Sequence, residues 1–266
     1  MIVKPHWLCS KEENMLKSII KNSFKETNEC IILLAPLVLI VTFIFIYSLY
    51  IYNSANNIFK FFLSSTAMIV VVSICFSAWF YLLKKVYKLS DKVFVYDSDR
   101  VKEVKKIFNS VSEGISSLFI PIFLFFIFYA LLYGYFTILF YEWGVNYLFI
   151  FVDTGLSYFT PENIFAFVMV LLMHYILLFT IPEIVYVEKN PYKAFINSVK
   201  KLVITFPHSL LLFLYIFILL LLVYLFSLLL LSLSPYLYFV VSLFLYYIIL
   251  YVFVLIFGAY EKFFLK

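Results

Sequence analysis

The stretch from Ser209 to Leu233 reads SLLLFLYIFILLLLVYLFSLLLLSL and contains no charged residue. A helix of about 20 apolar residues is long enough to cross the hydrocarbon core of a bilayer. Five more apolar runs of similar length occur, approximately at Ile31 to Tyr52, Phe61 to Leu83, Leu118 to Tyr141, Asn163 to Ile181 and Tyr236 to Phe257. Inside a bilayer each segment has to satisfy its own backbone hydrogen bonds, which an α-helix does. The sequence therefore predicts an all-α, polytopic membrane bundle with six transmembrane helices, in a single membrane domain over residues 1–266.

The composition excludes an ordinary soluble domain. Hydrophobic residues make up 65% of the chain and charged residues 13%, whereas soluble domains contain about 45–50% and about 25%. Arg100 is the only arginine among 20 basic residues, and glutamine does not occur. This composition suggests an AT-rich prokaryotic source. The three cysteines form no paired framework, so we expect free thiols.

The basic residues predict the orientation of the spans. Nineteen of the 20 lie in the N-terminal tail, the second and fourth connections and the C-terminal tail, and Lys60 alone lies in the other connections. Because cytoplasmic loops are enriched in Lys and Arg, we expect both termini to be cytoplasmic and the protein to be a multi-pass protein of the cell membrane. The connection over residues 142–161 is rich in aromatic residues and could be interfacial or re-entrant.

An amphipathic segment precedes each outward-going span and contains an Asn-Ser-apolar step. These steps are Asn22-Ser23-Phe24, Asn109-Ser110-Val111 and Asn197-Ser198-Val199. We interpret the chain as three parallel repeats of a surface helix plus a transmembrane hairpin, approximately at residues 10–83, 100–187 and 190–260. A chance recurrence of Asn-Ser in common Lys-rich helices is the alternative.

The amphipathic segments are expected to lie on the membrane surface with their lysines toward lipid headgroups. Each lysine near an anionic leaflet contributes about 1 kcal/mol to membrane binding. Anionic membrane lipids are therefore the expected partners, although plain anchoring explains the same lysines and is the favoured alternative. The candidate lipid-facing residues are Lys17, Lys21, Lys25, Lys102, Lys105, Lys106, Lys200 and Lys201.

His174 is the candidate intramembrane polar site. It is the one titratable side chain other than Tyr and Cys deep inside a predicted span, and such groups are candidates for proton or ligand sites. A neutral histidine bonded to a nearby Tyr or Ser is the favoured alternative, because no acidic residue lies within a span.

The segment after the fourth span is expected to be structural. Asn190 can cap the next helix with Pro191 in its first turn. Glu183 and Glu188 could face Lys193, Lys200 or Lys201 and fix that helix against the bundle. Small residues at Ser73 and Ser77, and at Ala130 and Gly134, have the four-residue spacing that lets membrane helices approach closely.

The run from Thr180 to Ser198 resembles a broad group of uncharacterised prokaryotic six-span membrane proteins, which includes the membrane domain of some glycerophosphodiester phosphodiesterases. There, a proline ends the fourth span, a Glu follows, and an Ala-x-x-x-Ser helix precedes the fifth span. The matching residues are Pro182, Glu188, Ala194 and Ser198. The resemblance implies an integral membrane protein concerned with lipids or the envelope, and the motif covers only about twenty residues.

No catalytic residues are predicted. The sequence contains no H-E-x-x-H, G-x-S-x-G or phosphate-binding glycine loop, and His6 with Cys9 lacks the second pair that a zinc site needs. Basic residues are divided among separate membrane-adjacent segments, so we expect no nucleic-acid binding. We therefore expect no enzyme, cofactor or metal, but a non-catalytic lipid-interacting or envelope-maintenance module. A transporter or channel with a site near His174 is the alternative.

Overall fold

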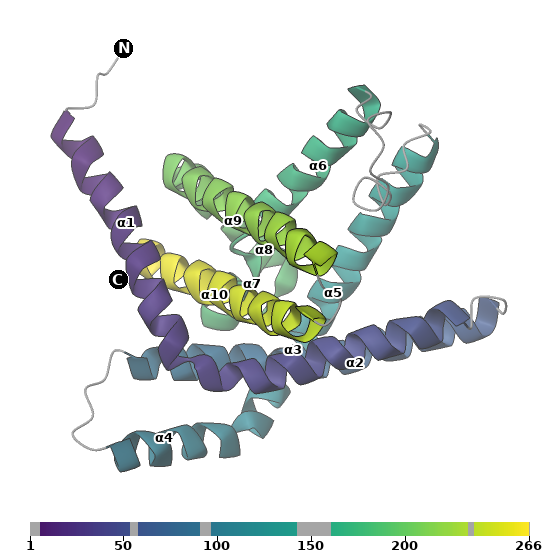
Figure 1. Cartoon of the computed structure of the whole chain (residues 1–266), viewed down its shortest axis with the longest axis horizontal. Coiled ribbons are helices and arrows are strands. Elements are labelled where there is room, and N and C mark those ends of the chain that lie inside the picture. Colours follow the sequence, from purple (N-terminus) through teal and green to yellow (C-terminus); the bar gives the residue numbers. More distant parts are fainter. Residues whose placement is uncertain (1–5, 54–57, 91–96, 143–160, 234–236, 266) are drawn as a thin grey trace.

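The computed structural model of the protein describes residues 6–53, 58–90, 97–142, 161–233 and 237–265. Every described element is a helix (Figure 1). In chain order these are α1 His6–Glu29, the 3-10 helix η1 Ile31–Leu33, α2 Leu34–Asn53, α3 Ile58–Ser90, α4 Asp97–Asn109, α5 Val111–Glu142, α6 Pro161–Leu177, α7 Thr180–Tyr186, α8 Pro191–Ile204, α9 Phe206–Leu233 and α10 Tyr238–Phe264.

Six segments are long and apolar enough to cross a membrane. They are Ile31–Ser48, Leu63–Leu89, Val111–Phe136, Ile164–Tyr186, Phe206–Leu230 and Val240–Phe264. The prediction of six apolar helices is therefore confirmed, and the chain has the make-up of an integral membrane protein. The connection over 143–160 lies outside the described residues.

A one-residue joint precedes the first, third and fifth spans. Cys30, Ser110 and Thr205 separate α1 from η1, α4 from α5 and α8 from α9. The backbone N–H of each still donates to the carbonyl four residues earlier, at 2.9, 3.2 and 3.0 Å respectively. Because these hydrogen bonds continue across the joint, an amphipathic helix can lead directly into a span without a loop.

The fourth span differs from its prediction. It does not end at Pro182 but continues to Tyr186, broken into α6 and α7. Pro182 lies in the first turn of α7, where its missing N–H would have no partner within the helix. The proline is therefore compatible with the start of a short second helix inside the span.

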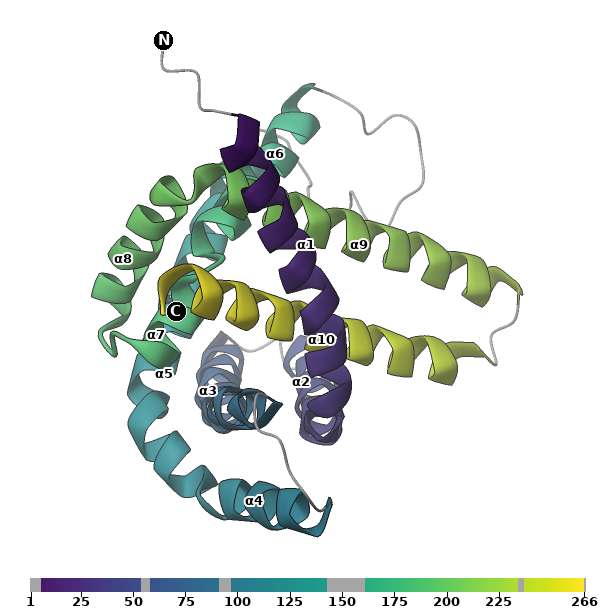
Figure 2. The ribbon, with the colours of Figure 1, turned by 90° about the vertical axis from the view of Figure 1, so that its left-hand side faces the viewer.

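One end of the molecule, here called the basic end, contains α1, α4, α7 and α8 together with the C-terminal ends of α3 and α10 (Figure 2). Arg100 Nη2 donates to the Glu29 carbonyl at 3.3 Å and joins α4 to α1. Lys84 Nζ donates to the Val185 carbonyl at 2.7 Å and joins α3 to α7. Figure 2 looks toward this end, with α1 crossing in front of α10 and with α4 and α8 at the periphery.

The tightly packed core lies toward the basic end. Trp79, Phe80, Phe257 and Tyr260 are among the largest fully buried side chains, and Trp79 Nε1 donates to the Leu33 carbonyl at 3.1 Å. Toward the opposite end many apolar side chains are exposed on α2, α5 and α9. In Figure 1 the hairpin α5–α6 rises to the upper right while α2 and α3 run nearly horizontally. The hairpins therefore pack tightly at one end and diverge toward the other.

The sequence predicts an apolar stripe on α1 formed by Leu16, Ile19, Ile20 and Phe24, but the face that contacts protein also contains polar residues. Ile19, Ser23 and Thr27 of α1, together with Cys30 directly after it, are almost fully buried. Ile19 packs in a cluster with Leu255, Ala259 and Tyr260 of α10. Part of the stripe expected to contact the bilayer is therefore covered by α10.

The small-residue prediction was right for one helix and wrong for another. Ser73 and Ser77 on α3 are fully buried. On α5, however, Ala130 is exposed, and a Cβ added at Gly134 would meet nothing within 4 Å. The close approach on α5 occurs at Gly114, where an added Cβ would lie 2.3 Å from Cγ of Tyr81 on α3.

Candidate functional site

A buried carboxylate connects three helices at the basic end. The Glu183 side chain on α7 is 1% exposed and forms an ion pair with Lys201 on α8, with Nζ and Oε2 2.5 Å apart. The Tyr260 hydroxyl on α10 donates to the same Oε2, and Asn197 Nδ2 donates to Oε1 at 3.4 Å. A buried charge is tolerated when it is paired and hydrogen-bonded, and Glu183 has both kinds of contact.

The start of α8 sets the position of these partners. The Asn190 side chain accepts hydrogen bonds from the backbone N–H groups of Tyr192 and Lys193, at 3.1 and 3.2 Å, so the predicted cap is confirmed. Pro191 occupies the first turn. Glu188 accepts the Asn190 N–H at 3.0 Å, which places Glu188 in the connecting turn. Asn197 and Lys201, four residues apart, then lie on the same face of the helix and both reach Glu183.

Ser198 lies on the same side of α8, next to Asn197 and Lys201. With Ala194 and Leu202 it forms the fully or nearly fully buried face of α8. Among the described residues its hydroxyl oxygen has no hydrogen-bond partner, and the same holds for Ser23 on α1. Ser23 and Ser198, the two fully buried serines of the Asn-Ser steps, therefore both have a buried hydroxyl without a hydrogen bond among the described residues.

A second polar contact joins α1, α3 and α10. A Cβ added at Gly258 would lie 2.9 Å from the Tyr87 hydroxyl and 3.6 Å from both Glu26 Oε2 and Ser23 Oγ. A side chain at this position would require the Tyr87 hydroxyl to move, whereas glycine leaves it in place. Three residues after Gly258, Glu261 Oε2 accepts a hydrogen bond from the Tyr186 hydroxyl of α7 at 3.4 Å.

Seven of the eight candidate lipid-facing lysines are exposed. They are Lys17, Lys21, Lys25, Lys102, Lys105, Lys106 and Lys200. Lys102 and Lys106 pair with Asp99 and Glu103 at 3.4 and 3.0 Å, and exposed pairs of this kind contribute little. Lys201 departs from the expectation, because its ammonium turns inward to the buried Glu183 carboxylate.

His174 lies near the middle of the fourth span and contacts α5. The Tyr129 hydroxyl is 3.2 Å from Nε2, and Nδ1 is 2.8 Å from the Val170 carbonyl. A carbonyl can only accept, so Nδ1 carries a proton. In the neutral tautomer with this proton, Nε2 accepts from the Tyr129 hydroxyl. A histidine bonded to a tyrosine is the contact that the favoured alternative predicts.

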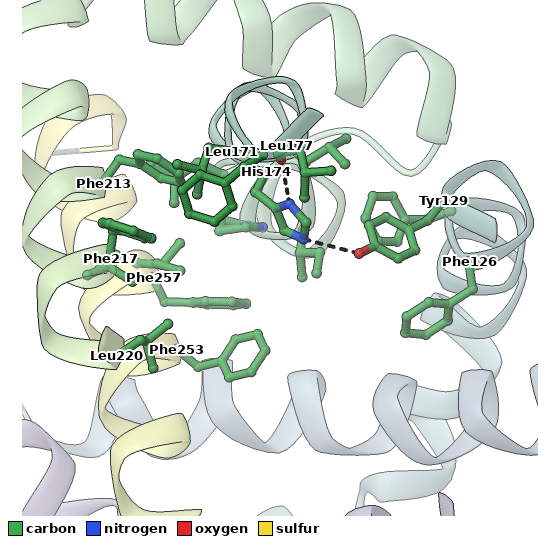
Figure 3. Close-up of a pocket in the computed structure, with 18 residues that line it drawn as sticks. Phe126, Tyr129, Leu171, His174, Leu177, Phe213, Phe217, Leu220, Phe253 and Phe257 are labelled. Carbon is green, nitrogen blue, oxygen red and sulfur yellow. Dashed lines mark hydrogen bonds between the residues drawn. The ribbon is translucent and has the colours of Figure 1, made fainter. Parts of the chain in front are cut away.

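His174 and Tyr129 line an apolar cavity of about 600 Å³. Figure 3 shows the pair on one side, facing a group of side chains from α9 and α10 that includes Phe213, Phe217 and Phe257. Pro182 of the structural motif also lines it. The cavity thus adjoins both the histidine site and the α7 segment.

Two participants were not predicted from the sequence. Lys84 Nζ lies over the Tyr186 ring at 4.9 Å in addition to its bond to Val185, and Tyr260 shares the Glu183 carboxylate. The pair Gly258-Ala259, small residues in a run of bulky ones, was the available signal that another helix approaches α10 there.

Comparisons with protein-family models, curated proteins and solved structures found no match.

Proposed function

We propose that the protein is a non-catalytic, lipid-binding module of the cell membrane, with both termini in the cytoplasm. The observation that carries this proposal is the set of seven exposed lysines on α1, α4 and the end of α8. Basic clusters beside membrane spans attract anionic headgroups. With the basic end in the cytoplasm, these lysines face the leaflet that is richest in such lipids.

Apolar side chains next to the lysines support the same proposal. Phe24 on α1, Val101 on α4 and Val203 with Ile204 on α8 are more than half exposed. An interfacial helix places such side chains among the acyl chains and its lysines among the headgroups. Each of the three helices can therefore contact both parts of a lipid.

A cyclic pattern of contacts supports three parallel repeats. Ser23 of the first copy lies beside Gly258 in the third hairpin, the Tyr81 hydroxyl of the first hairpin donates to Ser110 of the second copy at 3.1 Å, and Asn197 of the third copy bonds to Glu183 in the second. Each Asn-Ser step thus contacts the hairpin of another copy. The position of the serine relative to the joint differs between copies. Ser110 is the joint residue, whereas Ser23 and Ser198 lie two helical turns before the joints at Cys30 and Thr205. The resemblance of the run from Thr180 to Ser198 to six-span prokaryotic membrane proteins is a further argument for a lipid-related role.

Lipid retention tests the proposal. We would release the protein from mixed phosphatidylglycerol and phosphatidylcholine membranes and count bound lipids by native mass spectrometry. The triple variant Lys21→Gln, Lys105→Gln and Lys200→Gln removes one charge from each helix. Each helix should then retain about fivefold less phosphatidylglycerol, since each charge contributes about 1 kcal/mol. The matched triple Lys→Arg variant keeps the charges and should bind as the unaltered protein does. Equal retention by the Gln and Arg variants would refute the proposal.

Transport through a site near His174 is the alternative function, favoured by the position of His174 in a cavity within the spans. A transport path requires water to reach the cavity. Cysteines introduced at Leu171 and Phe217, which line it, would then react with a small water-soluble thiol reagent. The lipid-binding proposal predicts no reaction at either position in the folded protein.

A further inference from the structure

The cavity between α5, α6, α9 and α10 is almost entirely apolar. Its lining consists of Phe, Leu, Ile, Val and Pro side chains apart from Tyr129 and His174. Its volume of about 600 Å³ lies within the range of about 300–1,000 Å³ typical of ligand pockets. No charged side chain lines it, so burying a charged headgroup there would be very unfavourable.

The cavity is open toward the surroundings of the fourth span. His174 lines it and is nevertheless an exposed residue, and Leu220 of α9, which also lines it, is 42% exposed. These two residues lie within Ile164–Tyr186 and Phe206–Leu230, segments that can cross the membrane. A ligand entering by this side would therefore come from the bilayer.

The hydrogen bonds of His174 and Tyr129 determine which polar group of a ligand can bind in the cavity. His174 uses both ring nitrogens, Nδ1 toward the Val170 carbonyl and Nε2 toward Tyr129. The Tyr129 hydroxyl has one hydrogen, which it donates to His174, and its oxygen retains the capacity to accept. A ligand hydroxyl can donate to this oxygen without disturbing the pair, whereas a group without a donor cannot.

We propose that this cavity binds an uncharged lipid of the long-chain alcohol class, with its hydroxyl donating to Tyr129 and its chain along the phenylalanines of α9 and α10. Figure 3 shows the space between the His174–Tyr129 pair and Phe213, Phe217 and Phe253. His174 acts as a positioning residue, because it holds the Tyr129 hydrogen and turns the oxygen lone pair toward the ligand. The inference extends the proposed lipid-binding function to a second site and rests on that function only for the ligand being a lipid.

The ligand test compares two probes that differ by one hydrogen-bond donor. The protein, in lipid nanodiscs, is crosslinked with a diazirine-bearing long-chain alcohol, and the yield on peptides of α6 and α9 is measured. Unlabelled 1-hexadecanol should compete about fivefold better than hexadecyl methyl ether, the ratio expected for one buried hydrogen bond. Equal competition by the two compounds, or crosslinking that neither displaces, would overturn the proposal.

Variants test the residues. Tyr129→Phe should abolish the preference for the alcohol over the ether while leaving ether binding unchanged. Leu220→Trp, which fills the cavity from α9, should displace both compounds. The matched control Leu221→Trp changes the adjacent residue of α9, which is not part of the lining, and should bind as the unaltered protein does. A preference that survives Tyr129→Phe would overturn the assignment.

The outcome is distinguishable from failure of the proposed function. Loss of phosphatidylglycerol retention depends on Lys21, Lys105 and Lys200, whereas alcohol binding depends on Tyr129 and Leu220. The triple Lys→Gln variant should therefore bind the alcohol normally, and Tyr129→Phe should retain phosphatidylglycerol normally. Alcohol binding that is lost in the Lys→Gln variant would contradict a separate site in the bundle.

Discussion

Glu183 is a single side chain whose environment explains how α7, α8 and α10 are held together. Its carboxylate is nearly inaccessible and contacts Lys201, Tyr260 and Asn197. The sequence predicted a lysine partner but left Lys193, Lys200 and Lys201 open. The choice depends on how α8 is rotated against α7. The Asn190 cap, which the sequence predicts, sets where α8 begins. The face of α8 that is buried could not be predicted, because it depends on how the helices dock.

Replacing one member of the pair should destabilise the protein more than replacing both. Lys201→Met leaves the Glu183 carboxylate without its counter-charge and should cost about 3 kcal/mol of unfolding free energy. The double variant Glu183→Gln, Lys201→Met removes both charges and should regain much of that loss. Unfolding in detergent by heat or denaturant measures each variant. Additive effects of the two substitutions would contradict the ion pair.

Cys30 should resist thiol reagents in the folded protein. It is fully buried at the joint after α1, and burial, with the negative charges of Glu26 and Glu29, raises the pKa of its thiol to about 12. The neutral thiol therefore stabilises the fold fully below pH 9, and this contribution is lost as the pH rises toward 12.

Maleimide labelling at pH 8 measures this reactivity in a chain with Cys9→Ser and Cys75→Ser. We expect labelling of Cys30 only after denaturation. A control with cysteine at exposed Lys25, in the same background with Cys30→Ser, should react when folded. Rapid labelling of Cys30 in the folded protein would contradict the position of α1 on α10.

At the scale of the elements, the close approaches between helices depend on individual glycines. Gly114 allows α5 to approach the base of the Tyr81 ring, and Gly258 allows α10 to approach Tyr87 and α1. The spacing of Ala130 and Gly134 suggested the wrong contact, because spacing shows that a helix could approach closely but not which partner lies there. Gly114 stands near the start of α5, where α3 is its neighbour.

Two alanine substitutions on α5 should differ in their effect on the free energy of unfolding. A Cβ at position 114 would overlap the Cβ and Cγ atoms of Tyr81, at 2.5 and 2.3 Å, which a rotamer change cannot move far. Gly114→Ala should therefore cost about 1–3 kcal/mol. Gly134→Ala has open space and should be neutral or slightly stabilising, because alanine favours a helix interior over glycine. Thermal unfolding of the two variants checks this, and similar losses in both would contradict the packing of α5 on α3.

At the scale of the whole molecule, the number and order of the spans were predictable and their packing was not. Few backbone structures satisfy all their hydrogen bonds inside a bilayer, so length and hydropathy are enough to predict the spans. Whether hairpins diverge, and which side chains then line a cavity, depends on contacts between distant residues such as Tyr129 and His174. The continuation of the fourth span past Pro182 was missed for a related reason, since a proline early in a helix is read from sequence as an end.

The orientation of this molecule is the claim on which its lipid-binding role depends. Single cysteines at Lys21, Lys105, Lys200 and Lys60, in a chain without other cysteines, would be exposed to a membrane-impermeant maleimide on intact cells. We predict labelling at position 60 alone, with positions 21, 105 and 200 reacting only after the membrane is permeabilised. Labelling of any of these three on intact cells, or protection of position 60, would contradict a basic end that faces the cytoplasm.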